Sequence, residues 1–178
     1  MPQTCRHALL ERPDASVAVP ETIIHEADGS TRPARGAAPM DGRTALRLAR
    51  YLARPADNSR FYGMYRTDAV RRSFPQDLVE APAADWVISA LSLVQGVHVR
   101  ARGGRLHRTG SPPERYARSA RARAVSPVHR LLPTASATRD LLRRLPPILR
   151  LTSIPSLLVM ASHQALWHGW LTLRAKRA

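Results

Sequence analysis

Two stretches near the middle of the sequence hold the residues best suited to chemistry. Residues 58–66 place aromatic side chains, a glycine and arginine within nine positions, a density typical of a pocket wall. Asp85 follows in the first turn of a predicted helix. The positive N-terminus of a helix favours an ionised carboxylate, which could take a proton from a substrate hydroxyl. A plain N-terminal cap is the alternative role for Asp85.

A second group of titratable residues, His25, Glu26 and Asp28, directly precedes Gly29. These residue types could bind a metal ion or form an acid–base cluster. However, Asp-Gly after a β-branched run is a strong signal for a tight turn between two strands. We therefore interpret the group as the solvated tip of a β-hairpin.

Charge is distributed unevenly along the chain. Residues 1–90 hold 12 arginines against 11 acidic residues, whereas residues 91–178 hold 16 basic residues against two acidic ones. A basic half suggests an anionic partner, such as nucleic acid, a phospholipid surface or a phosphorylated substrate. Cys5 is the only cysteine, which favours a reducing compartment, and no signal peptide is indicated. We expect a cytoplasmic protein that can attach peripherally to the inner face of the membrane.

The apolar pattern predicts the elements that would position these residues. Apolar side chains recur at helical spacing from residue 86 to residue 94, and Gly96 is suited to end that helix. Residues 97–101 then alternate apolar and polar, as in a half-buried strand, and Gly103-Gly104 predicts a turn. Nearer the N-terminus, Pro20 is expected to divide two short strands.

Two further elements precede the first stretch. Residues 31–39 are rich in proline, glycine and alanine and predict a loop. Asp41 is then placed to cap a helix that reaches Ala53.

The C-terminal tail combines arginines with a long uncharged run. Residues 151–173 contain no charged side chain and are numerous enough to cross a bilayer. Pro155 and several polar residues make a spanning helix unfavourable. We expect an interfacial helix with Trp167 and Trp170 at the level of the lipid headgroups, so that residues 137–178 contact an anionic membrane surface. An amphipathic helix packed on the domain is the alternative.

With these elements in order, residues 6–116 resemble the family 2 glycosyltransferases, the GT-A-fold enzymes that transfer a sugar from a nucleotide donor. Residues 58–70 are similar to the family's segment in which a glycine-containing strand leads into a helix. Ala84-Asp85-Trp86 resembles the family's E/D-D-W box. Arg105-Leu106-His107 falls where many members carry an Arg-x-His near the donor diphosphate and the metal.

The resemblance implies an α/β fold of the GT-A (Rossmann-like) type, a glycosyltransferase activity, and a nucleotide-sugar and an acceptor as partners. Asp85 would be the catalytic base. His107 would contact the divalent metal, Mg²⁺ or Mn²⁺, of an intact family member. The substrate-binding residues would be Asn58, Arg60, Tyr62, Arg66, Trp86 and Arg105.

The sequence departs from the family in one respect: it contains no Asp-x-Asp, the motif that holds the metal and the donor. The resemblance therefore covers the C-terminal portion only, without the N-terminal nucleotide-binding half. We expect an incomplete GT-A-like domain over residues 1–123 and a mostly helical, basic tail over residues 124–178. An unpaired apolar sheet edge and an inactive isolated chain are expected with it.

A basic protein that binds nucleic acid or a membrane surface without catalysis is the alternative function. The arginines between residues 115 and 130 suggest nucleic acid. They lack interleaved aromatics and a recognisable module, and a bias towards arginine explains their charge as well. We therefore do not expect nucleic acid to be a partner.

Overall fold

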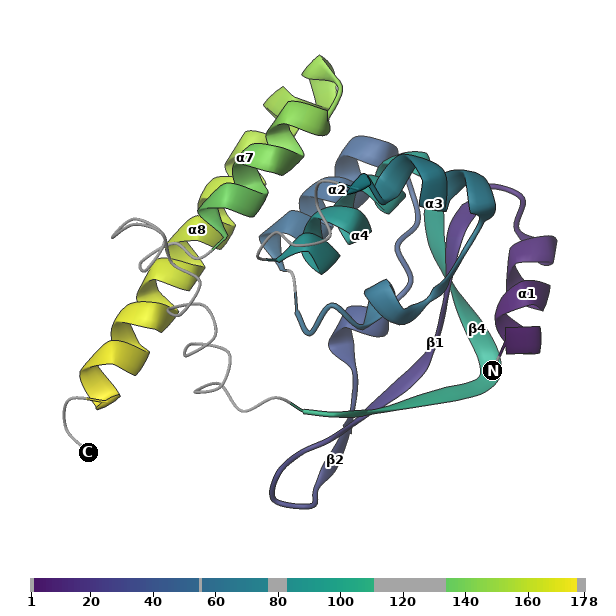
Figure 1. The fold of residues 1–178 in the computed structure, drawn as a ribbon, viewed down its shortest axis with the longest axis horizontal. Coiled ribbons are helices and arrows are strands. Elements are labelled where there is room, and N and C mark those ends of the chain that lie inside the picture. The colour runs from purple at the N-terminus through teal and green to yellow at the C-terminus, as the bar shows by residue number, and fades with distance from the viewer. Residues whose placement is uncertain (1, 55, 77–82, 111–133, 176–178) are drawn as a thin grey trace.

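A computed structural model describes residues 2–54, 56–76, 83–110 and 134–175 (Figure 1). The α/β class is confirmed, because these residues form a mixed four-stranded sheet and six α-helices. The helices are α1 (Pro2–Glu11), α2 (Thr44–Ala53), α3 (Thr67–Ser73), α4 (Ala84–Gln95), α7 (Ala135–Arg144) and α8 (Pro147–Ala175).

The sheet is built around one long strand, β1 (Ala15–His25). Along one edge, β1 pairs in parallel with β4 (Val97–Thr109). Along its other edge it pairs antiparallel with β3 (Met64–Tyr65) near its start and with β2 (Thr31–Pro33) near its end. The predicted turn at Gly29 joins β1 to β2, with Gly29 at a φ of 83°.

Two predicted interruptions of the strands are wrong. Pro20 does not divide β1, and Gly103-Gly104 does not end β4. The register explains both, because Pro20 pairs with Ala101 and the next residue, Glu21, pairs with Arg105. The intervening residues of β4 form a bulge, which accommodates an extra length of chain and the positive φ of Gly103, 79°.

The two faces of the sheet pack against different layers. Ala18 and Val99 pack under α1, whereas Val17 faces the opposite side and packs with Ala34 and Tyr65. Figure 1 shows α2, α3 and α4 on that opposite side, with α7 and α8 outside them. The main core joins α2, α4, α7 and α8 through Leu48, Tyr51, Leu52, Trp86, Val87, Ala90, Leu91, Leu93, Ala137, Leu141, Leu145, Leu157 and Met160.

The helix predicted to carry Asp85 is confirmed as α4, with Gly96 as its C-cap. The reason for a glycine there is close approach rather than a left-handed backbone. A Cβ on Gly96 would lie 2.6 Å from the carbonyl oxygen of Asp14 and 2.7 Å from the nitrogen of Ser16. Gly96 thus lets the end of α4 sit directly against the start of β1.

Two other expectations are corrected. Asp41 does not cap α2, whose N-cap is Arg43, and accepts a hydrogen bond from Arg12 instead. The segment predicted as a loop contains β2 and a short 3-10 helix, Arg35–Ala37. The apolar sheet edge that we expected is not found along β4, whose exposed side chains include Arg100, Arg102 and Arg105. Such charges discourage pairing with another strand.

The predicted boundary at residues 123 and 124 lies outside the described residues, as do Arg115 to Arg130 and the side chains of Trp167 and Trp170. The described helices of the tail share a core with α2 and α4. Within the described part of the chain, no helix combines the length and the hydropathy needed to cross a membrane.

Candidate functional site

The centre of the candidate site is a short segment, residues 57–62, which we call the Asp57 loop. The Asp57 carboxylate accepts hydrogen bonds from the backbone nitrogens of Gly36 and Ser59 and from the Ser59 hydroxyl. Burial by itself would raise the pKa of Asp57, but these hydrogen bonds outweigh it and hold the pKa below its ordinary value. Asn58, next in the chain, is left-handed with a φ of 48°, a conformation that asparagine tolerates well. The loop is therefore fixed from within.

Asn58 links the loop to Asp85. Its amide nitrogen donates to Asp85 Oδ2 at 2.9 Å, and its amide oxygen accepts the hydroxyl of the buried Tyr51, also at 2.9 Å. A carboxylate can only accept, so the NH₂ group of Asn58 faces Asp85 and its amide oxygen is left to accept from the Tyr51 hydroxyl. The side chain of Asp85 is exposed at the N-terminus of α4. One carboxylate oxygen is thereby held in place on a side chain that is otherwise exposed.

Arg60 belongs to the loop, but its side chain extends into the interior of the protein. It is 2 % exposed, and its guanidinium lies 5.2 Å from the centre of the Tyr51 ring. Its terminal nitrogens contact His98 Nδ1 and the carbonyl oxygen of Ala38, both at 3.3 Å, and its Nε has no hydrogen-bond partner. Burial lowers the pKa of Arg60. The structure thus places this predicted substrate-binding residue in the interior.

His98 completes this interior network. Its side chain is fully buried, and its Nε2 lies 3.0 Å from the hydroxyl of Ser92 on α4. Burial, together with the positive charges of Arg60 and Arg47, lowers the pKa of His98 well below its usual value. The imidazole is therefore neutral and can accept from Arg60 through Nδ1.

Among the described residues of β4, Arg108 is the only arginine whose guanidinium contacts the Asp57 loop. It donates to the carbonyl oxygen of Asp57 at 3.2 Å and to the hydroxyl of Ser59 at 2.9 Å. It also lies over the ring of Tyr62, 4.4 Å from its centre, and Tyr62 is 50 % exposed. The Asp85 carboxylate and the Arg108 guanidinium therefore both contact the Asp57 loop, which also carries the exposed ring of Tyr62.

The Arg-x-His pair predicted for the same site lies elsewhere. Successive residues of a strand point to opposite faces, so His107 faces away from its neighbour Arg108. His107 Nδ1 lies 2.9 Å from His25 Nε2, and Arg105 forms an ion pair with Glu21 at 3.0 Å. The structure therefore does not bring Arg105 and His107 together with Asp85.

The surroundings of His107 do not fit a divalent metal. The ring centroids of His107 and His25 are 5.2 Å apart, and the two nitrogens are 2.9 Å apart. The difference equals about two ring radii, so the two nitrogens point at one another. That is the geometry of a hydrogen bond, not of two ligands converging on an ion. Mg²⁺ and Mn²⁺ also prefer oxygen ligands. Among the described residues, no group of three or more His, Cys, Asp or Glu could hold a metal ion.

Two other predicted substrate-binding residues serve the fold. Arg66 donates to the carbonyl oxygens of Leu9, Arg12 and Ala15, which ties the C-terminal end of α1 to β1. Trp86 is 6 % exposed and packs beside Tyr51 in the main core. Of the predicted site residues, the structure therefore joins the buried Asn58 to the exposed Asp85, and it places Tyr62, which is exposed, and Arg60, which is buried, in the same loop as Asn58.

Sequence reasoning missed Tyr51 and Arg108. Tyr51 lies on the apolar face of α2 and carries no motif. Arg108 is adjacent to the predicted His107. It is an even number of residues from His98, which also contacts the Asp57 loop, so strand alternation counted from His98 was the one signal available for it.

Comparisons of this chain with protein-family models, with curated proteins and with solved structures found no match.

Proposed function

We propose that this chain supplies the acceptor-activating side of a GT-A-type glycosyltransferase, with Asp85 as the catalytic base. The observation that carries the proposal is the arrangement of its carboxylate, which is exposed at a helix N-terminus and oriented by the Asn58 amide. A buried relay, from Tyr51 through Asn58, fixes that orientation. Asn58 is thus a positioning residue.

In the proposed reaction, the open oxygen of Asp85 takes the proton of an acceptor hydroxyl. The acceptor oxygen forms a bond with the anomeric carbon of the donor sugar, and the bond from that carbon to the nucleoside diphosphate breaks. The diphosphate leaves with the bonding electrons and gains negative charge, which the guanidinium of Arg108 can stabilise. Tyr62 offers its exposed ring to the apolar face of a sugar. No step is assigned to a metal ion.

The first test measures saccharide binding by saturation-transfer NMR with UDP-glucose, UDP-N-acetylglucosamine, GDP-mannose and free monosaccharides. Asp85→Asn removes the charge that would accept from the acceptor hydroxyl, so we expect acceptor affinity to fall about tenfold. Asp68→Asn is the matched control, since Asp68 is an exposed carboxylate in the first turn of α3. Equal effects of the two variants, or no saccharide signal in the unaltered chain, would contradict the proposal.

A second measurement follows release of nucleoside diphosphate. We expect no turnover by the chain alone, because its sequence has no Asp-x-Asp to hold the donor. Where a protein supplying donor binding restores turnover, Asp85→Asn should lower kcat at least about 100-fold with little change in KM. A kcat equal to that of the unaltered chain would exclude Asp85 as the base.

A further inference from the structure

The helix α8 has apolar side chains on two opposite sides. One side, with Ser153, Leu157 and Met160, is buried against the main core. The other side carries large apolar residues that face solvent. Leu157 is 5 % exposed and its neighbour Leu158 is 62 % exposed. Packing within the described part of the chain therefore leaves large apolar side chains of α8 exposed.

The exposed apolar residues form a continuous stripe. They recur at intervals of three, seven and eight residues, so they lie along one side of the helix over about 27 Å, at 1.5 Å per residue. We call them the α8 stripe: Ile148, Leu151, Leu158 and Leu166, with Val159 beside them. A stripe of this size is unusual on a surface that contacts only water.

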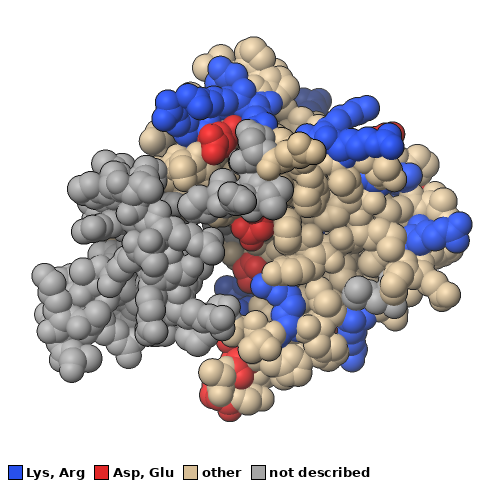
Figure 2. Space-filling model, in the orientation of Figure 1, with Lys and Arg blue, Asp and Glu red and all other residues tan. Residues whose placement is uncertain are grey.

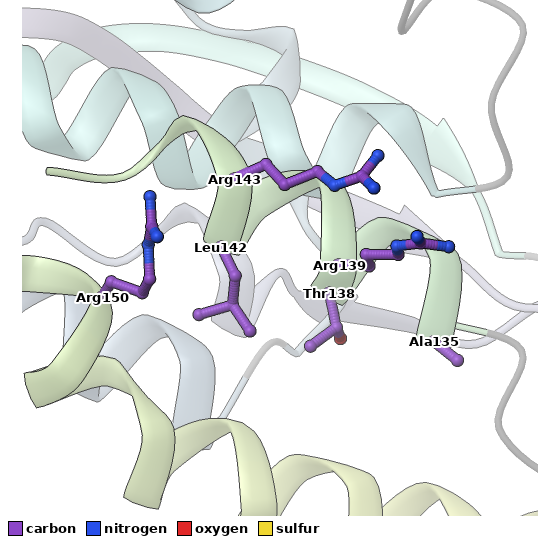
Figure 3. Close-up of a pocket in the computed structure, with 6 residues that line it drawn as sticks. All are labelled: Ala135, Thr138, Arg139, Leu142, Arg143 and Arg150. Atoms are coloured by element: carbon purple, nitrogen blue, oxygen red, sulfur yellow. The ribbon is translucent and has the colours of Figure 1, made fainter. Parts of the chain in front are cut away.

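A basic hollow adjoins the start of the stripe. It lies between α7 and α8, has a volume of about 310 Å³ and is lined by Ala135, Thr138, Arg139, Leu142, Arg143 and Arg150. Figure 3 shows Thr138 and Leu142 pointing from α7 toward α8, with Arg150 rising beside them from the first turns of α8. Ile154 is 42 % exposed and follows Arg150 by four residues, so it lies on the same side of α8 and brings the basic residue next to the exposed apolar ones.

The arginines of this hollow form no ion pair within the described part of the chain. Arg139 and Arg143 form no ion pair with a carboxylate in the described part of the chain, and Arg150 donates to the carbonyl oxygen of Leu145. Basic side chains gather over α7 in Figure 2. No acidic residue follows Asp140 in the sequence. An anion can therefore approach Arg139 and Arg143 without displacing a described carboxylate partner.

We propose that α7 and α8 dock on an anionic phospholipid membrane. The α8 stripe would lie at the boundary between headgroups and acyl chains, and the basic hollow would take a lipid phosphate. A second copy of this chain, packed through its own α8, could cover the stripe, but that helix contains no carboxylate to bring to the three arginines. An anionic lipid surface satisfies both features. This proposal does not depend on the sugar-transfer proposal.

The test is co-sedimentation of the full chain with phosphatidylcholine vesicles, with and without 30 % phosphatidylserine. The double variant Leu151→Asp, Leu158→Asp places charges on the stripe, so we expect binding to fall at least about 100-fold, or tenfold for each leucine. The control is Leu10→Asp, Leu46→Asp, because both residues are exposed but lie on α1 and α2. Equal loss in both double variants would overturn the proposal.

The arginines are tested separately. Arg139→Ala, Arg143→Ala should weaken binding to phosphatidylserine vesicles about fivefold per arginine, with a loss of salt dependence. Arg100→Ala, Arg102→Ala removes the same charge from the exposed residues of β4 and should have a smaller effect. Circular dichroism checks that each variant is folded. Failure of the unaltered chain to bind either vesicle would overturn the proposal, as would a dimer that the stripe variant converts to a monomer.

Discussion

The Asp57 loop region and the pair of helices α7 and α8 use arginine in different ways. Near the loop, Arg60 is buried against an aromatic ring and Arg108 donates to the loop itself. On α7, Arg139 and Arg143 are exposed and form no ion pair with a described carboxylate. The first pair contacts other groups of this chain, whereas the second has no ion-pair partner among the described residues. A high arginine content therefore does not by itself indicate a binding surface.

The largest expected difference between the two regions is in the free energy of unfolding when one arginine of each is replaced by alanine. Arg60→Ala empties a site that is 2 % exposed and should lower the free energy of unfolding by about 4 kcal/mol. Arg139→Ala changes an exposed side chain and should stay within about 0.5 kcal/mol of the unaltered chain. Urea denaturation measures both. Similar losses would mean that the two arginines are not used differently.

A second contrast lies within α8, between adjacent leucines. Leu157→Ala should lower the free energy of unfolding by about 3 kcal/mol, because Leu157 packs in the main core. Leu158→Ala should cost less than about 0.5 kcal/mol, because the side chain already faces water. The same denaturation experiment compares them. A large cost for Leu158 would indicate that the stripe is covered within the chain.

The smallest expected effect is a pH dependence carried by His98. Its pKa is far below 6.5 in the folded protein, so between about pH 6.5 and pH 5 the unfolded chain takes up a proton that the folded chain does not. Stability should therefore fall as the pH is lowered through this window, by up to about 1.4 kcal/mol per pH unit. His98→Gln should flatten this slope.

His163→Gln is the control for that measurement, because His163 is exposed on α8. Its slope between pH 6.5 and pH 5 should match that of the unaltered chain. If His163→Gln flattened the slope and His98→Gln did not, the buried network would not be the source of the pH dependence.

Local signals predicted the elements whose backbone is decided by neighbours along the chain. The apolar spacing of α4 and its end at Gly96 are confirmed, as is the turn at Gly29. Pro20 and Gly103 gave wrong predictions because each is accommodated by the other strand. A bulge in β4 sits opposite Pro20, and a pairing between residues far apart in the sequence leaves no local signature.

The candidate site was predictable only in part, for the same reason. Asn58, Tyr62 and Asp85 were identified from residue type. The structure joins Asn58 to Asp85 by a hydrogen bond and leaves Tyr62 exposed in the same loop as Asn58. Arg105 and His107 were predicted to lie with them. In the structure, Arg108 contacts the loop instead, and His107 contacts His25. Their roles in sugar transfer stay a prediction.

The sequence by itself determined the helices with clear periodicity, the tight turn, and the concentration of basic charge in the second half. Only the tertiary structure decided which arginines are buried, which face of β4 meets the Asp57 loop, and which side of α8 is left without a partner. These features depend on strand register and helix packing, which join residues far apart in the chain. Residue type and spacing do not specify such contacts.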